Sequence, residues 1–312
     1  MKNIIYSLVF LSSLTLMAQN DINYDGIFIG SYVPHQIEHV PQGAKKMLSN
    51  KLNQIITSKG IANNNYNGRF IITPNITVLS KDIVASAPPK IALNLEVTFY
   101  IGDGIEGTVF ASESINAKGV GTNENKAYMA AIRQIRAKSP ILQDFVKNGK
   151  KRVIEYYNNN CNLVLKKVDR LSAQNNYEEA LATIAGVPEV SSCFDKFKNK
   201  INTIYIKAIN VSCKRKLNEA SSIWAANQDL NAANEAGAIL ATIEPQADCF
   251  GEVKALYQNI SERIKAKELL DRDWQYKLKE LDVKRSSIQA ARDIGVAYGL
   301  NQQPVYNIRG WY

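Results

Sequence analysis

The spacing of apolar residues divides this chain into an N-terminal part that mixes strands with helices and a C-terminal part that is helical. Strict alternation predicts a strand over 90–101, where every second residue from Ile91 to Phe99 is apolar. A spacing of three and four residues predicts one helix over 41–60 and a second that begins after 118–124, with Thr122 or Asn123 as its cap. Runs of β-branched and aromatic residues predict three further strands, over 26–33, 69–79 and 108–118. The expected order is β-α-β-β-β-α, within an α+β domain over 19–145.

From Ile141 onward the apolar spacing is helical until near Gly295. We expect paired helical hairpins over 146–248, followed by one long amphipathic helix over 249–294. At ~1.5 Å per residue this last helix would span roughly 65 Å, which is more than a compact domain needs and favours self-association into a homo-oligomer. Basic residues interrupt its heptads, so an amphipathic helix that packs along its own chain is an equal alternative to a coiled coil.

All four cysteines lie in the helical part, inside a unit that occurs twice. Each copy begins at a cysteine, contains Leu-Ala-Thr-Ile and a proline, and closes on Cys-Phe. Four cysteines allow three pairings, and the repeat favours the disulfides Cys161–Cys193 and Cys213–Cys249. The loops would be similar in length (193 − 161 = 32 and 249 − 213 = 36). On the chain-entropy model, each bond would stabilise the fold by roughly 3–4 kcal/mol.

The first residues, 1–18, have the pattern of a secretory signal peptide. A charged start precedes an apolar run over 4–17 and Ala18, so we expect the mature chain to begin at Gln19, with no transmembrane segment after cleavage. An uncleaved anchor is the alternative, because Leu16 is large for its position before the cut. An even number of cysteines fits export to an oxidising compartment. The expected location is periplasmic or associated with the outer envelope, or secreted.

The net charge of +9 is spread along the chain, because Lys and Arg alternate with Asp and Glu over most helical stretches. A nucleic-acid-binding protein would have a basic face with interleaved aromatic residues. Since neither this pattern nor a known motif is visible, no nucleic-acid partner is expected. The excess charge favours solubility, or weak attraction to anionic polymers and lipid head groups of the envelope.

His35-Gln-Ile-Glu-His39 matches H-x-x-E-H, the inverted zinc-peptidase motif in which two histidines bind zinc and the glutamate acts as the base. That chemistry needs both histidines on one face of a helix, but Pro34 and Pro41 bracket the segment. We interpret it as a surface loop and expect no cofactor. A zinc peptidase that uses His35, Glu38 and His39 is the alternative.

Gly102-x-Gly104-x-x-Gly107 matches the dinucleotide-binding fingerprint, but a strand follows it instead of a helix. Phosphate binding by this motif needs the N-terminus of a helix, so we interpret it as a hairpin turn. No G-x-S-x-G nucleophile motif occurs in the sequence. We therefore predict no catalytic residue.

The last segment, 295–312, is an aromatic tail that either docks on the fold or engages a partner. Its aromatic residues Tyr306, Trp311 and Tyr312 are the predicted partner-binding residues, together with Trp274 of the long helix.

The predicted order, with the turn Lys118-Gly-Val-Gly-Thr-Asn-Glu-x-x-Ala127 leading into the closing helix, resembles the α+β domain of certain envelope proteins. These are the penicillin-binding-protein activator lipoproteins, the curli secretion channel and the TolB amino-terminal domain. The resemblance covers about Asp21 to Phe145. The lipobox of the lipoprotein members and the transmembrane hairpin of a channel are both missing from this sequence.

The helical part is similar to tetratricopeptide-type hairpins. Asn176-Tyr-Glu-Glu-Ala-Leu181 is similar to the turn and helix start of such hairpins, and Pro188 to their stop. The spacing differs, since the first cysteines of the two copies are 52 residues apart (213 − 161) while the tetratricopeptide period is about 34. Hairpin families of this kind are adaptors, which implies protein binding. We therefore expect a non-enzymatic, exported scaffold for protein partners in the envelope, or a structural component of a larger exported assembly.

Overall fold

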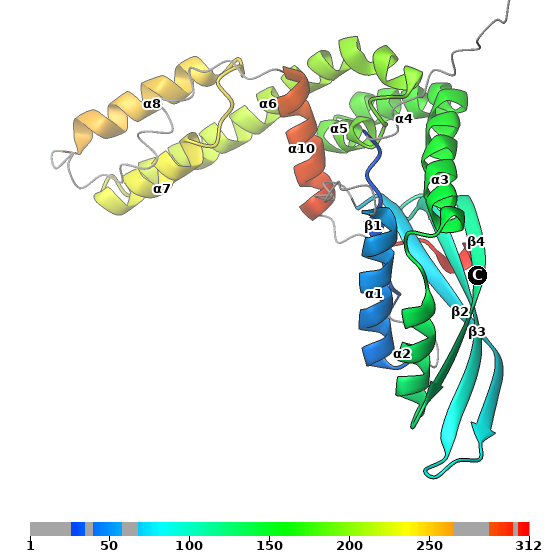
Figure 1. The fold of residues 1–312 in the computed structure, drawn as a ribbon. Helices are drawn as coiled ribbons and strands as arrows, with labels where there is room; N and C mark the ends of the chain where they lie inside the picture. The colour runs from blue at the N-terminus through cyan, green and yellow to red at the C-terminus, as the bar shows by residue number, and fades with distance from the viewer. Residues whose placement is uncertain (1–25, 35–39, 58–67, 265–286, 302–304, 312) are drawn as a thin grey trace, which may run out of the picture.

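The computed structural model describes residues 26–34, 40–57, 68–264, 287–301 and 305–311. Several predictions concern segments outside these ranges: the signal peptide at 1–18, the zinc-motif residues His35, Glu38 and His39, and the aromatic residues Trp274 and Tyr312. Within the described residues, the chain combines one mixed sheet with many helices (Figure 1), so the predicted α+β class is confirmed.

Four strands form the sheet in sequence order: β1 (Gly30–Ser31), β2 (Phe70–Val84), β3 (Lys90–Asp103) and β4 (Thr108–Gly121). β1 is parallel to β2, and the other neighbours are antiparallel. Alternate residues of β3, from Leu93 to Ile101, are buried on one face, as the period of two predicted. The register places Leu95 of this row opposite Val78 of β2 and Ala117 of β4.

Helices α1 (Gln42–Ile56) and α2 (Glu124–Gln134) cover that face, and α3 (Pro140–Asn159) starts beside them and continues past the sheet (Figure 1). Asn123 caps α2 by accepting a hydrogen bond from the Lys126 amide at 2.9 Å. The small residues of α2 allow a close approach to β4. A Cβ on Gly119 would lie 2.1 Å from the carbonyl oxygen of Ala127, so only glycine fits there.

After α3 the helices form two consecutive hairpins that share one helix. They are α4 (Cys161–Ala173), α5 (Tyr177–Ala185), α6 (Ser192–Ala226), α7 (Leu230–Leu240) and α8 (Phe250–Arg263). Cys161 is bonded to Cys193 and Cys213 to Cys249, which is the pairing that the repeat favours. α7 and α8 pack on α6 and on each other, and extend away from the sheet as a hairpin arm (Figure 1).

The single long helix expected over 249–294 is interrupted at Ile264, and its part over 265–286 lies outside the described residues. α8 ends at Arg263, because the backbone of Ile264 is extended (φ −80°, ψ 105°). A separate helix, α10 (Ser287–Asn301), packs against α5 and α6. Gly295, which was expected to end the long helix, lies inside α10. A Cβ there would lie 2.6 Å from the carbonyl carbon and oxygen of Leu181, so the glycine lets α10 approach α5 closely.

Two glycines of α10 give a matched test of this approach. Gly295→Ala is expected to destabilise the fold by about 1–3 kcal/mol, because the added methyl group overlaps the α5 backbone. A Cβ on Gly299 meets no atom within 4 Å, so Gly299→Ala should stabilise the helix by about 0.5–1 kcal/mol. Urea unfolding of both variants measures the difference. Equal effects would contradict the close packing of α10 on α5.

Candidate functional site

The turn between β3 and β4 connects the sheet to the helical hairpins. Asp103 at its start is only 1% exposed, and its Oδ2 accepts a hydrogen bond from Arg69 Nε at 2.6 Å. Its Oδ1 accepts hydrogen bonds from the backbone amides of Ile105 and Glu106, each at 3.0 Å. A buried carboxylate is costly unless it is paired and hydrogen-bonded. These contacts therefore hold the turn and the Arg69 side chain in one arrangement.

Glu106 extends this network to the helices. Its Oε1 lies 2.9 Å from Lys167 Nζ of α4 and 3.5 Å from Arg69 Nη2. The hydrogen bond from Lys167 is the main reason that the pKa of Glu106 lies below its ordinary value, and the charges of Lys167 and Arg69 add to it against an opposing effect of burial. The carboxylate is thus charged at neutral pH and ties the turn to the first hairpin.

The predicted hairpin turn is confirmed, and its glycines are explained by the C-terminal segment 305–311. A Cβ on Gly102 would lie 2.5 Å from the Trp311 ring, and one on Gly104 would lie 2.5 Å from the Tyr306 ring. Gly107 has a positive φ of 77°. We call these three glycines the glycine socket. The motif that resembles a dinucleotide fingerprint therefore makes room for part of the same chain.

Two of the predicted partner-binding residues occupy this socket. Trp311 is buried, and its Nε1 donates to the Gly107 carbonyl at 2.8 Å. The Asn307 amide donates to the Gly104 carbonyl at 2.6 Å, and the ring of Tyr306 packs edge-on against Tyr32. The tail thus docks on the fold, the first of the two outcomes expected for it. With Ile71 and Ile308, Trp311 forms a small second core, separate from the main one.

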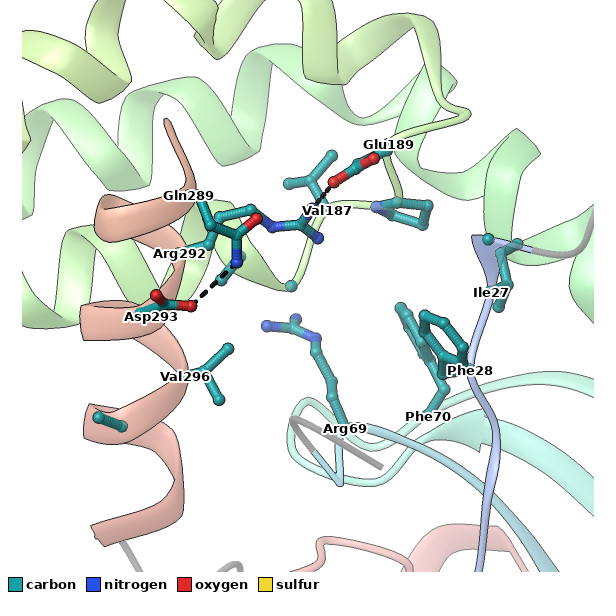
Figure 2. Close-up of a pocket in the computed structure, with 15 residues that line it drawn as sticks. Ile27, Phe28, Arg69, Phe70, Val187, Glu189, Gln289, Arg292, Asp293 and Val296 are labelled. Atoms are coloured by element: carbon teal, nitrogen blue, oxygen red, sulfur yellow. Dashed lines mark hydrogen bonds and ion pairs between the residues drawn. The ribbon is translucent and has the colours of Figure 1, made fainter. Parts of the chain in front are cut away.

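Arg69 also lines a cavity of about 570 Å³ between the end of the sheet, the α5–α6 connection and α10. We call it the junction cavity. Figure 2 shows the guanidinium group of Arg69 pointing into it between Phe70 and Val296. Most of the wall is apolar and comes from four segments that are distant in the sequence: Ile27, Phe28, Phe70, Val187, Pro188 and Val296.

The charges around the junction cavity balance one another. Arg69 is paired with Asp103, as described above. Arg292 forms an ion pair with Glu189 and lies over the ring of Phe194, 5.7 Å from its centroid. Asp293 accepts a hydrogen bond from Gln289 Nε2 at 3.0 Å (Figure 2). The cavity therefore combines apolar walls with polar groups that are already paired within the chain.

Sequence reasoning did not identify the junction cavity. The available signal was a pair of opposite charges, Arg69 and Asp103, each next to an apolar run at the same end of neighbouring antiparallel strands. In the part of the chain that the structure describes, no group of three or more His, Cys, Asp or Glu side chains is arranged to hold a metal ion. The four cysteines all lie in disulfides.

Removal of the buried carboxylate tests the network. Asp103→Ala is expected to lower the free energy of unfolding by about 3–5 kcal/mol, because Arg69 loses its partner in a buried site. The matched control is Asp169→Ala, which removes an exposed ion pair with Lys200 and should cost about 0–1 kcal/mol. Urea unfolding measures both variants. Similar losses in the two would show that Asp103 has no special role.

Comparisons with protein-family models, with curated proteins and with solved structures found no match to this chain. The resemblance of the N-terminal half to the envelope families, and that of the helical part to tetratricopeptide hairpins, therefore stay predictions from the residues.

Proposed function

We propose that this chain is an exported, non-enzymatic scaffold that binds a segment of a protein partner in the junction cavity. The observation that carries the proposal is the combination of mostly apolar walls with internally balanced charge in a cavity of about 570 Å³. Such a volume is within the range of ligand pockets, and sites of this kind are often found where parts of a fold meet.

The paired charges favour an uncharged segment over a free anion. An anion beside Arg69 would compete with Asp103 and Glu106, which already surround that guanidinium group. An apolar peptide would instead pack against the apolar walls, and its carbonyl groups would accept hydrogen bonds from the remaining N–H groups of Arg69. Glu189 and Asp293 offer acceptors for peptide N–H groups from the opposite side. This chemistry suits a protein partner in the envelope.

Export is supported by the two disulfides, which persist in oxidising compartments. Among the described helices, none is both long enough and apolar enough to cross a membrane. In the proposed arrangement the α+β part and the hairpins act as one platform, and the hairpin arm offers a second docking face. Since α10 packs on its own chain, the cavity and the arm are better candidates for partner contact than a C-terminal coiled coil.

A photo-crosslinking amino acid tests the cavity. Benzoylphenylalanine in place of Phe28, which lines the cavity and is 42% exposed, is expected to yield a discrete adduct in the organism that encodes the chain. The matched position, Leu163 on α4, is 65% exposed outside the cavity and should yield none. Val296→Trp, which fills the cavity, should abolish the Phe28 adduct. Adducts that persist in this folded variant would contradict the proposal.

Export has its own test by mass spectrometry of the protein recovered from cells without reductant. The mature chain is expected to begin at Gln19 and to contain the bonds Cys161–Cys193 and Cys213–Cys249. Free thiols would contradict an oxidising compartment, and a retained N-terminus would contradict cleavage. The zinc content of wild type and of His39→Ala tests the peptidase alternative. Stoichiometric zinc that is lost in the variant would favour the peptidase.

A further inference from the structure

The β2–β3 hairpin projects beyond the body of the molecule. Figure 1 shows it extending past the ends of α1 and α2, on the side away from the hairpin arm. Every residue over 77–90 is exposed, and we call this segment the hairpin tip. At ~3.4 Å per residue its β2 part, Thr77–Val84, is roughly 25 Å long. The tip is therefore a protruding element that has no role in the main core.

The hairpin tip is apolar for an exposed element. Its connection, residues 85–89, is Ala-Ser-Ala-Pro-Pro and has no charged side chain. Ile83 (79% exposed) and Val84 (43%) adjoin this connection, and Val120 of β4 (54%) lies nearby. Val78 (42%) and Leu79 (50%) are exposed further along β2, where Val78 lies opposite Leu95 of β3. Single exposed apolar residues are ordinary, but a cluster at the end of a projecting hairpin indicates an interaction site.

A basic surface begins behind the tip and continues along α2 away from it. Lys90, Lys126 and Arg133 line a groove that also includes Val120. Arg133 continues into a second groove, which is lined by Lys51, Arg136 and Lys138. No aspartate or glutamate is among the described residues that line either groove.

Three acidic residues lie nearby. Glu124 is paired with Lys81 at 2.8 Å, Asp82 is on the hairpin itself, and Glu96 of β3 lies opposite Thr77. The groove linings, which carry no acidic side chain, therefore form a cationic surface that extends from Lys90 at the tip along α2.

We propose that this end of the molecule binds an anionic lipid bilayer. The aliphatic side chains of the tip enter the boundary between head groups and acyl chains, and the basic surface contacts lipid phosphates. Each lysine or arginine held near such a surface raises partitioning by about fivefold at physiological salt. The charge complementarity and the position of the apolar cluster in front of the cations point to the same occupant.

The free edge of β2 sets the depth of this contact. Among the described residues, β2 pairs from Asn75 onward only with β3, since the pairing with β1 ends at Ile72. Its outer backbone N–H and C=O groups need water or head groups as partners, and they cannot enter the hydrocarbon core. Asp82 likewise remains in the head-group layer. The tip therefore lies in the interface and does not span the membrane.

Two other occupants account for less of the surface. A soluble polyanion would use the cations but would leave the aliphatic cluster exposed to water. A partner strand added to the β2 edge would use the backbone and the aliphatic side chains but would not need the basic grooves. Of the three occupants, only an anionic bilayer uses both the aliphatic side chains and the basic grooves. This contact is independent of the junction cavity, which lies at the other end of β2.

The test is co-sedimentation of the full mature chain with phosphatidylcholine vesicles, with and without phosphatidylglycerol. Wild type is expected to bind only the anionic vesicles. Ile83→Asp with Val84→Asp should weaken binding by at least tenfold, and Lys126→Glu with Arg133→Glu by roughly twentyfold or more, at about fivefold for each lost cation. The controls are Leu163→Asp with Val211→Asp, and Lys151→Glu with Lys200→Glu, all on the helical part. The control with Leu163→Asp and Val211→Asp should bind anionic vesicles like wild type. The control with Lys151→Glu and Lys200→Glu should lose far less vesicle affinity than the variant with Lys126→Glu and Arg133→Glu.

The depth to which the tip inserts is measured separately with Ile83→Trp. On binding anionic vesicles, the fluorescence of the new tryptophan should shift to the blue and be quenched by brominated lipids. Circular dichroism checks that every variant is folded. Equal binding of tip and control variants would overturn the proposal, as would equal binding of wild type to neutral vesicles. Heparin binding that needs Lys126 and Arg133 but not Ile83 would identify a polyanion site instead. Lipid-independent association that is abolished by Ile83→Asp would identify strand pairing.

Discussion

The buried carboxylate of Asp103 is the interaction on which the arrangement of this molecule depends. It holds the side chain of Arg69, which directly precedes the neighbouring strand β2, and two backbone amides of the β3–β4 turn. Through Glu106 and Lys167 the same turn contacts the first helical hairpin. Because a charge in this position must remain fully hydrogen-bonded, the sheet, the turn and the wall of the junction cavity are fixed together.

The glycine socket shows why a sequence motif needs its structural context. Three glycines at fingerprint spacing occur where backbone and ring atoms of the C-terminal segment approach the turn. In dinucleotide-binding proteins such glycines admit a pyrophosphate group at a helix N-terminus. Here they admit Tyr306, Asn307 and Trp311. The shared requirement is the absence of a side chain, and the neighbouring elements decide what uses the space.

Much of the architecture follows from local pattern. The period of two in β3 and the capped start of α2 act over short distances, while the cysteine repeat can be read directly from the sequence; each predicted an observed element or bond. The break at Ile264 was missed because apolar spacing continues across it. The junction cavity was missed because Phe28, Arg69 and Val296 meet only in three dimensions. Periodicity describes which face of an element is buried, but not which distant element buries it.

α10 supplies one wall of the junction cavity and follows almost all of the other elements along the chain. During synthesis, the cavity therefore remains open on this side until α10 has been made and has packed on α5. An incomplete chain can form the sheet and both disulfides without offering the finished site.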